Sequence, residues 1–231
     1  DGIMRGKVGR LLSHLAAWRA KHIIVVSEGL ANRVRRWRKP LSVIPSGINL
    51  ERFYPMSKSK CRDEIGWSPT VKVVLFNRGS DAFLKGEDLV LESMEELRSC
   101  GEVCQLFVLD GNVPHDKLPL YINAADCVVL ASRHEGSPNI VKEAMACEVP
   151  VVSVDVGDVR ERLSESTRSC LVESRDSALF AEAILRILRE ERRGSDRALI
   201  SSLELGQVSR RVVSVYESVA RRMWENGEEE A

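Results

Sequence analysis

The stretch from residue 132 to residue 159 constrains the fold more than any other part of the sequence. It contains an apolar strand end, a glycine loop, a short apolar helix, a second apolar strand and another glycine turn, in that order. Ser137 is a favoured helix N-cap, and Pro138 suits the first helical position because its missing N–H would be unpaired there. We therefore expect a strand, helix, strand unit whose helix begins near Pro138.

Two carboxylates flank the start of this helix. The first-turn amides and the positive end of the helix dipole would face the loop that carries Glu135 and Gly136, which is a physical basis for holding a phosphate. In the second turn, Glu143 can accept paired hydrogen bonds from the hydroxyls of a ribose, while Glu135 can take hydroxyls of another sugar. The alternative is that both are ordinary surface acids, since charged residues are mostly exposed.

The whole run decides between these interpretations. It resembles the C-terminal, donor-binding domain of GT-B glycosyltransferases of family four (group 1). That family's signature is a glutamate, seven intervening residues and a second glutamate, followed by Ala-Met-Ala and a Pro-Val-Val strand. Here Glu135 and Glu143 have the same spacing, with Ala-Met-Ala at 144–146 and Pro-Val-Val at 150–152. The resemblance extends from about residue 18 to residue 216.

Apolar runs at 71–76, 103–109, 127–131 and 149–153 alternate with helical patterns. This alternation predicts an α/β fold with a doubly wound parallel sheet, which is Rossmann-like. The resemblance implies the C-terminal half of a GT-B glycosyltransferase. We assign residues 1–50 to the end of the N-terminal domain and the hinge, 51–205 to the nucleotide-sugar (donor) binding domain, and 206–231 to a C-terminal helix with a frayed tail.

Before residue 50 the pattern predicts a helix at 7–20, a strand at 22–27, a helix at 28–38 capped by Ser27, and a strand at 41–45. The Pro-Ser-Gly-Ile-Asn run at 45–49 is similar to the Pro-Asn-Gly-Val-Asp run with which the family enters its hinge, but it has serine in place of the asparagine and asparagine in place of the aspartate. We expect the chain to pass from one domain to the other here.

Arg78 and Lys85 lie in the loop after the 71–76 strand. Ligands of open α/β sheets gather at the carboxyl ends of strands, so these cations are placed to bind a diphosphate. The alternative is two solvent-facing cations. In the family a Gly-Arg followed by Lys-Gly binds donor phosphates at this point. This chain has Asn77 before the arginine, and Val156 in place of the first glycine of a later Gly-Gly pair.

The resemblance also implies a role for each candidate residue. Arg78 and Lys85 neutralise the leaving diphosphate, and Glu135 orients the donor sugar; these three are the candidate catalytic residues. The main chain of Val113 meets the nucleotide base, and Glu143 holds the ribose. The donor-binding residues are completed by Gly136, Ser137, Pro138 and Asn139. No metal or other cofactor is expected, since the nucleotide-diphosphate sugar is a substrate.

The amino-acid composition limits the classes of binding partner and the cellular locations that we expect. The 231 residues include 34 basic and 34 acidic side chains, so no global field favours nucleic acid. A basic cluster at 33–39 is interpreted first as a solvated helix face, and second as a contact with a membrane surface or a polyanionic acceptor. No apolar run approaches the ~20 residues of a spanning helix, and the first residues are not a signal peptide. We expect a cytoplasmic protein, with the inner membrane surface as the alternative location. The six cysteines are expected to be reduced.

The sequence therefore predicts a retaining glycosyltransferase of hexosyltransferase type, acting in polysaccharide or glycoconjugate biosynthesis. Its acceptor would be a glycan, a lipid or a small molecule. The family's first domain needs well over ~100 residues before residue 18. The chain is accordingly expected to be a truncation, the product of a split gene, or the partner of a separately encoded N-terminal domain. A second interpretation is a non-catalytic nucleotide-sugar-binding module acting with a partner chain, and a third is a GT-B epimerase or phosphorylase.

Overall fold

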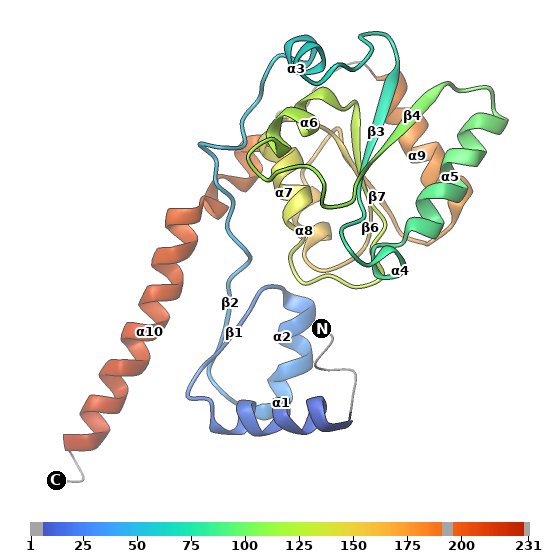
Figure 1. The fold of residues 1–231 in the computed structure, drawn as a ribbon. Coiled ribbons are helices and arrows are strands. Elements are labelled where there is room, and N and C mark those ends of the chain that lie inside the picture. The colour runs from blue at the N-terminus through green and yellow to red at the C-terminus, as the bar shows by residue number, and fades with distance from the viewer. Residues whose placement is uncertain (1–6, 191–195, 229–231) are drawn as a thin grey trace.

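The computed structural model describes residues 7–190 and 196–228. Within them, a five-stranded parallel sheet has the order β4-β3-β5-β6-β7 (Figure 1). Its three central strands are rich in valine and are buried on both faces, as a parallel sheet covered by helices requires, whereas the two edge strands are only partly buried. The strands are β3 (Lys72–Asn77), β4 (Cys104–Leu109), β5 (Cys127–Leu130), β6 (Val151–Val154) and β7 (Cys170–Val172).

Helices cover both faces of this sheet, so the predicted doubly wound α/β fold is confirmed. On one face, α5 (Glu87–Ser99) and α9 (Ser177–Arg189) bury a cluster that includes Phe76, Val90 and Phe180. On the other face the cluster includes Leu75, Val141 and Ile200. Each such side chain contributes roughly 1.5–3 kcal/mol when fully buried. The second face is covered by α6 (Leu118–Ala124), α7 (Asn139–Ala146), α8 (Val159–Leu163) and the 3-10 segment η3 (Asp196–Leu203).

An aromatic cluster lies beside this second face, next to α3 (Lys58–Ile65). The ring of Trp67 lies 4.7 Å from that of Phe107 and 5.8 Å from that of Tyr121, and Phe107 and Tyr121 are stacked at 5.1 Å. Aromatic pairs at these separations stabilise a fold beyond the area that they bury. The cluster joins the residue after α3 to β4 and α6.

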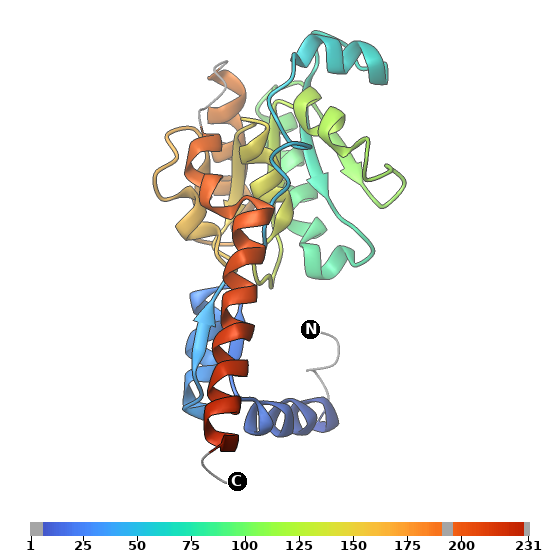
Figure 2. The same ribbon diagram turned by 90° about the vertical axis from the view of Figure 1, so that its left-hand side faces the viewer.

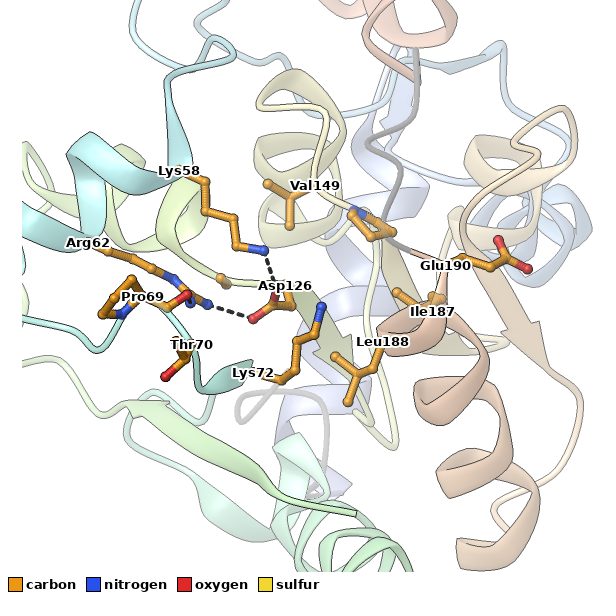
Figure 3. A pocket seen from close by; sticks show the side chains of 12 residues that line it. Lys58, Arg62, Pro69, Thr70, Lys72, Asp126, Val149, Ile187, Leu188 and Glu190 are labelled. Carbon is orange, nitrogen blue, oxygen red and sulfur yellow. Dashed lines mark hydrogen bonds and ion pairs between the residues drawn. The ribbon is translucent and has the colours of Figure 1, made fainter.

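A buried ion pair fixes α3 at the amino edge of the sheet. Figure 3 shows Lys58 and Arg62 pointing toward Asp126 in a cavity of about 420 Å³. Nη2 of Arg62 lies 2.6 Å from Asp126, which also accepts hydrogen bonds from Lys58 and from the main-chain N–H of Val73. Other N–H groups of Arg62 donate to main-chain carbonyls, among them that of Ala124 at 2.9 Å. Since these charges satisfy one another, we interpret the side chains that line this cavity as the contacts that hold α3 in place.

The N-terminal part is smaller. It comprises α1 (Lys7–Arg19), β1 (Ile23–Val25), α2 (Glu28–Val34), the 3-10 turn η2 (Arg35–Trp37) and β2 (Leu41–Val43). Strands β1 and β2 pair in parallel. The long helix α10 (Leu205–Glu228) leaves the five-stranded domain and runs alongside this part (Figures 1 and 2). Arg211 of α10 donates to the carbonyl of Val43 at 3.0 Å.

The chain passes between the two parts twice, in segments that lie side by side. The main-chain N–H of Ile48 donates to Leu203 at 2.8 Å, and that of Leu205 donates back to Ile48 at 2.9 Å. Gly47 packs against the first turn of α10, where a Cβ would lie 3.1 Å from the Leu205 side chain. We call residues 46–49 and 203–205 the crossing.

Apolar side chains remain exposed on the N-terminal part and on α10. On α1 they are Leu11, Leu12, Leu15 and Trp18, whose exposed fractions range from 47% to 68%. Their spacing places them on one side of the helix. On α10 they include Val213, Tyr216, Met223 and Trp224. A helix long and apolar enough to cross a membrane is absent from residues 7–190 and 196–228.

Some element ends differ from the sequence prediction. The helix expected at 28–38 ends at Val34 and continues only as the turn η2, after which Arg38 adopts a positive φ of 51°. The break expected near Gly206 lies before it, because the Glu204 carboxylate accepts the N–H groups of Gly206 and Gln207 at the start of α10. Helix α10 extends through Glu228, and residues 229–231, in the region of the expected frayed tail, lie outside the described ranges.

Candidate functional site

A crevice is expected where the strand order reverses. The chain passes from β3 to β4 on one side of the sheet and then to β5 on the other side of β3. Connections that leave in opposite directions open a binding crevice at the carboxyl ends of these strands. The loop that begins at Arg78 follows β3, and the loop that carries Glu135 follows β5. The topology therefore brings both predicted loops to one edge of the sheet.

Lys85 and Glu135 are in direct contact. Lys85 ends the short helix α4 (Ala82–Lys85), and its Nζ lies 2.7 Å from Oε1 of Glu135. The hydroxyl of Ser132 donates to the same oxygen at 2.8 Å. The next residue, Gly86, has a φ of +74°, and a Cβ there would lie 2.0 Å from the carbonyl oxygen of Ala131. Only glycine permits this close approach, which sets Lys85 beside residues 131–138, which we call the glutamate loop.

Arg78 is held separately. The main-chain N–H groups of Arg78 and Gly79 donate to the carbonyl of Leu109, which fixes the start of the loop to the end of β4. The guanidinium lies 3.5 Å from Glu87 and 3.7 Å from Asp110. Its side chain is about one-third exposed. The predicted phosphate-binding cation is thus at the expected edge, where it pairs with two acids at long distances. These acids are different from the acid partner of Lys85.

Glu143 lies in the second turn of α7, where the sequence placed it, and only 7% of the residue is exposed. Burial raises the pKa of its carboxyl to about 7, against the opposing effect of Lys142 and Arg52. No hydrogen bond joins this carboxylate to another residue within the described ranges. A buried carboxyl without a donor is costly unless a ligand or water supplies one, which makes Glu143 a candidate for binding hydroxyl groups.

The start of α7 departs from the prediction by one residue. Asn139 is the first helical residue, Pro138 occupies the cap position, and no side chain caps the helix. Ser137 is not the N-cap because its hydroxyl is used elsewhere: it donates to Oδ2 of Asp158 at 2.9 Å and accepts from Lys142 at 2.8 Å. Pro138 is buried, whereas Asn139 is exposed.

Gly136 lies where three segments meet. A Cβ on Gly136 would lie 2.8 Å from the side chain of Val26, which belongs to the N-terminal part. The carbonyl oxygen of Gly136 would lie 2.7 Å from a Cβ on Gly157, whose φ is +65°. The second glycine of the family's Gly-Gly turn is therefore kept at a position where a side chain would clash.

Val113, the residue expected beside the nucleotide base, lies in the loop between β4 and α6. Its side chain is partly buried and packs against the hydrophobic cluster that contains Ile48 and Ile122. Packing holds its main chain in place, and contact with a base stays a prediction.

A cavity of about 700 Å³ lies between α2 and the glutamate loop. Glu135 and Gly136 line it from the five-stranded domain, and Ser27 and Arg33 line it from the N-terminal part. Its size is that of a small-molecule site. Sequence reasoning missed other residues at its wall, although their position just after strands β5 and β6 signals them. They are Arg133, His134 and Asp155.

Two further charged residues escaped the sequence analysis, Lys142 and Asp158. Their exposed fractions are 0% and 2%. The signal for Lys142 was a second charge, directly before Glu143, in a helix whose other residues are mostly apolar, since buried lysines are rare unless paired. Among the residues that the structure describes, no three His, Cys, Asp or Glu side chains are grouped as the ligands of a metal ion would be.

Comparison with known proteins agrees with the geometry. Residues 78–190 match the family model for glycosyl transferases of group 1. The D-inositol 3-phosphate glycosyltransferase of Geodermatophilus obscurus is 28% identical over 179 residues, which cover 63% of this chain and 40% of that protein. The chain thus spans about two-fifths of the length of the curated relatives it matches.

Solved structures show the same fold. The sucrose-phosphate synthase of Thermosynechococcus elongatus superposes with a TM-score of 0.81 at 20% identity, over 96% of this chain and 64% of that one. Anabaena HepE in complex with UDP has a TM-score of 0.74 at 16% identity, over 90% of this chain and 67% of that one. With its parallel five-stranded sheet, the chain has the fold of the GT-B glycosyltransferases, and its residues 78–190 are similar to the glycosyl transferases of group 1.

Proposed function

We propose that the chain is the donor-binding half of a retaining glycosyltransferase that moves a hexosyl group from a nucleotide-diphosphate sugar to an acceptor. The observation that supports this most is the convergence at the carboxyl edge of the sheet. There Lys85 contacts Glu135 at 2.7 Å, and the buried Glu143 lies one helical turn beyond the same loop. A site for a diphosphate and for two sets of sugar hydroxyls needs these groups.

In this proposal the cations act on the leaving group. When the sugar–phosphate bond breaks, negative charge develops on the diphosphate, and Lys85 and Arg78 stabilise it electrostatically. Each cation then exchanges an acid partner for phosphate oxygens. Glu143 accepts the ribose hydroxyls, and Glu135 accepts a hydroxyl of the donor sugar. The cations do the work for which other enzymes use a metal ion, and the proposed reaction requires none.

The proposal includes an N-terminal domain supplied in trans or by a longer chain, which carries most acceptor contacts. Its docking surface is the exposed side of α1, with Leu11, Leu15 and Trp18, together with the open edges of the β1–β2 pair. The strand edges could be extended by strands of the docking domain, and the apolar stripe of α1 could pack against its helices.

Calorimetric titration with UDP, ADP and GDP tests the donor site, with thermal unfolding measured in parallel. One nucleotide should bind, and at 100 times its dissociation constant it should add about 2.7 kcal/mol of stability. The variant Glu143→Ala should lose most of this gain. If it responds as strongly as the parent chain, Glu143 does not hold the ribose.

A non-catalytic nucleotide-sugar-binding module is the second candidate. Arg78 is already paired with Glu87 and Asp110, and Lys85 with Glu135, so the site is neutralised without ligand. Nucleotide binding does not distinguish the two functions. Adding an N-terminal domain from a close relative does: sugar transfer supports the enzyme, whereas binding without transfer supports the module. Robust transfer by the 231-residue chain alone contradicts the assignment of a donor-binding half.

A further inference from the structure

Lys142 is a fully buried charge that the proposed chemistry does not use. It lies in α7 directly before Glu143, and its exposed fraction is 0%. A buried ammonium is expensive, and an apolar side chain of similar size would fill the same space at lower cost. Its presence in a buried helix therefore calls for a role other than stability.

The contacts of Lys142 join parts of the chain that are distant in sequence. Its Nζ donates to the carbonyl of Ser46 at 2.9 Å, and to the hydroxyl and carbonyl of Ser137 at 2.8 and 3.3 Å. The main-chain N–H of Ser46 donates to the same Ser137 hydroxyl at 3.3 Å. That hydroxyl donates in turn to Asp158 at 2.9 Å. Both main-chain groups of Ser46 are thus tied to the pair Lys142 and Ser137.

These three residues belong to elements with different tasks. Ser46 begins the crossing between the two parts of the chain, and two residues later Ile48 is bonded to Leu203 and Leu205. Ser137 lies two residues after Glu135 in the glutamate loop. Lys142 is on the helix that carries Glu143. A shift of the N-terminal part at Ser46 must therefore move the loop or break these hydrogen bonds.

We propose that Lys142 is a positioning residue that ties the glutamate loop to the crossing and so couples nucleotide binding to the relative placement of the two parts. The part of this inference that concerns nucleotide rests on the proposed function. The tie between Ser46 and Ser137 stands on the contacts alone.

The charges around Lys142 are mixed. Burial lowers the pKa of Lys142 to about 8, although Asp158 and Glu143 favour its charged form; Arg162 adds to the lowering. The ammonium has three N–H donors for its three acceptors, whereas the neutral amine has two. Above pH 8 the tie therefore loses one hydrogen bond.

The main test compares Lys142→Met and Ser137→Ala with Val141→Ala. Val141 is fully buried in the same helix and makes no polar contact through its side chain, so its truncation controls for lost stability. Hydrogen exchange should speed up at least tenfold at residues 45–48 and 136–139 in the first two variants, with strands β5 and β6 unchanged. In Val141→Ala these segments should keep the parent's protection relative to the strands.

UDP affinity at pH 7 should fall at least fivefold in Lys142→Met and Ser137→Ala, and less than twofold in Val141→Ala. Between pH 8 and 9 the parent's affinity should fall, while that of Lys142→Met stays flat. Exchange that rises uniformly over the molecule, or affinities equal to the parent's, would overturn the inference. If the parent binds none of UDP, ADP and GDP, the proposed function fails, and the exchange data still decide whether Lys142 ties Ser46 to the loop.

Discussion

Lys85 and Glu135, fifty positions apart in the sequence, form a 2.7 Å ion pair at the carboxyl edge of the sheet. Both side chains are partly exposed, at 32% and 17%, so the pair contributes little to stability. In the proposed donor site, each group would exchange this contact for one with the ligand. The contact is therefore better tested through binding than through unfolding.

Replacing Lys85 by Met should weaken UDP binding about 10- to 100-fold, because a hydrogen bond from a charged donor contributes about 1.5–3 kcal/mol. The melting temperature should change little. Lys60→Met, at an exposed position of α3, is the matched control and should bind UDP as the parent does. Equal affinities of the two variants would remove Lys85 from the site.

Glu143 should make stability depend on pH in an unusual direction. The pKa of its carboxyl is about 7 in the folded chain, compared with 4.5 for an ordinary glutamate, which we take for the unfolded chain. Between pH 4.5 and pH 7 the folded state therefore binds more protons than the unfolded state. Stability then falls as pH rises from 4.5 to 7, by roughly 3 kcal/mol for this group. Glu143→Gln should remove this loss and become the more stable form at pH 8.

Ionisation of Glu143 should also make nucleotide binding depend on pH. In the proposed site, the ionised carboxylate of Glu143 accepts both ribose hydroxyls, so the UDP affinity of the parent should rise between pH 6 and 8. Titrations of Glu143→Gln over this range should give a weaker and flat profile. A parallel rise in both proteins would assign the titration to another group.

Gly86→Ala and Gly101→Ala separate backbone strain from steric clash. Both glycines have a positive φ, +74° and +79°, but only at Gly86 would a Cβ meet another group, the Ala131 carbonyl at 2.0 Å. Gly101→Ala should cost about 1–2 kcal/mol, the penalty of the left-handed conformation. Gly86→Ala should cost roughly 1–3 kcal/mol more and should weaken UDP binding, because it displaces Lys85. Urea unfolding measures the difference, and equal losses would contradict the close approach.

Arg62→Met should destabilise the chain by about 3–5 kcal/mol, because it leaves Asp126 buried without its main partner. The double variant with Asp126→Asn should recover part of the loss. Arg160 forms a comparable pair with Asp155 and Glu173 at the surface, and Arg160→Met should leave the melting temperature within error. A small effect of Arg62→Met would mean that α3 is held by packing alone.

The sequence predicted the parallel sheet well because its three central strands are short valine-rich runs of the kind that buried strands require, and because glycines and prolines separate the strands. The neighbourhood of Lys85 and Glu135 followed from topology, since both come after adjacent strands. What sequence could not show was the use of each polar group. Ser137 looked like a helix cap because its alternative partners, Lys142 and Asp158, become neighbours only after folding.

The cavity wall was missed for a similar reason. Arg33 belongs to a basic run that periodicity assigns to solvent. It lines the cavity only because the folded chain places α2 opposite the glutamate loop. The end of α2 at Val34 was not predicted either, because no glycine or proline marks it. There the chain tightens into a 3-10 turn, and Arg38 reverses its direction.

The aromatic cluster of Trp67, Phe107 and Tyr121 gives the molecule a built-in optical label. Of the four tryptophans, only Trp67 belongs to the five-stranded domain, whereas Trp18, Trp37 and Trp224 lie on the N-terminal part and α10. Emission from a chain that keeps Trp67 alone will therefore report on one part, and emission from a Trp67→Phe chain on the other. Thermal unfolding of these two chains, followed by tryptophan fluorescence, can then show whether the two parts unfold together or separately.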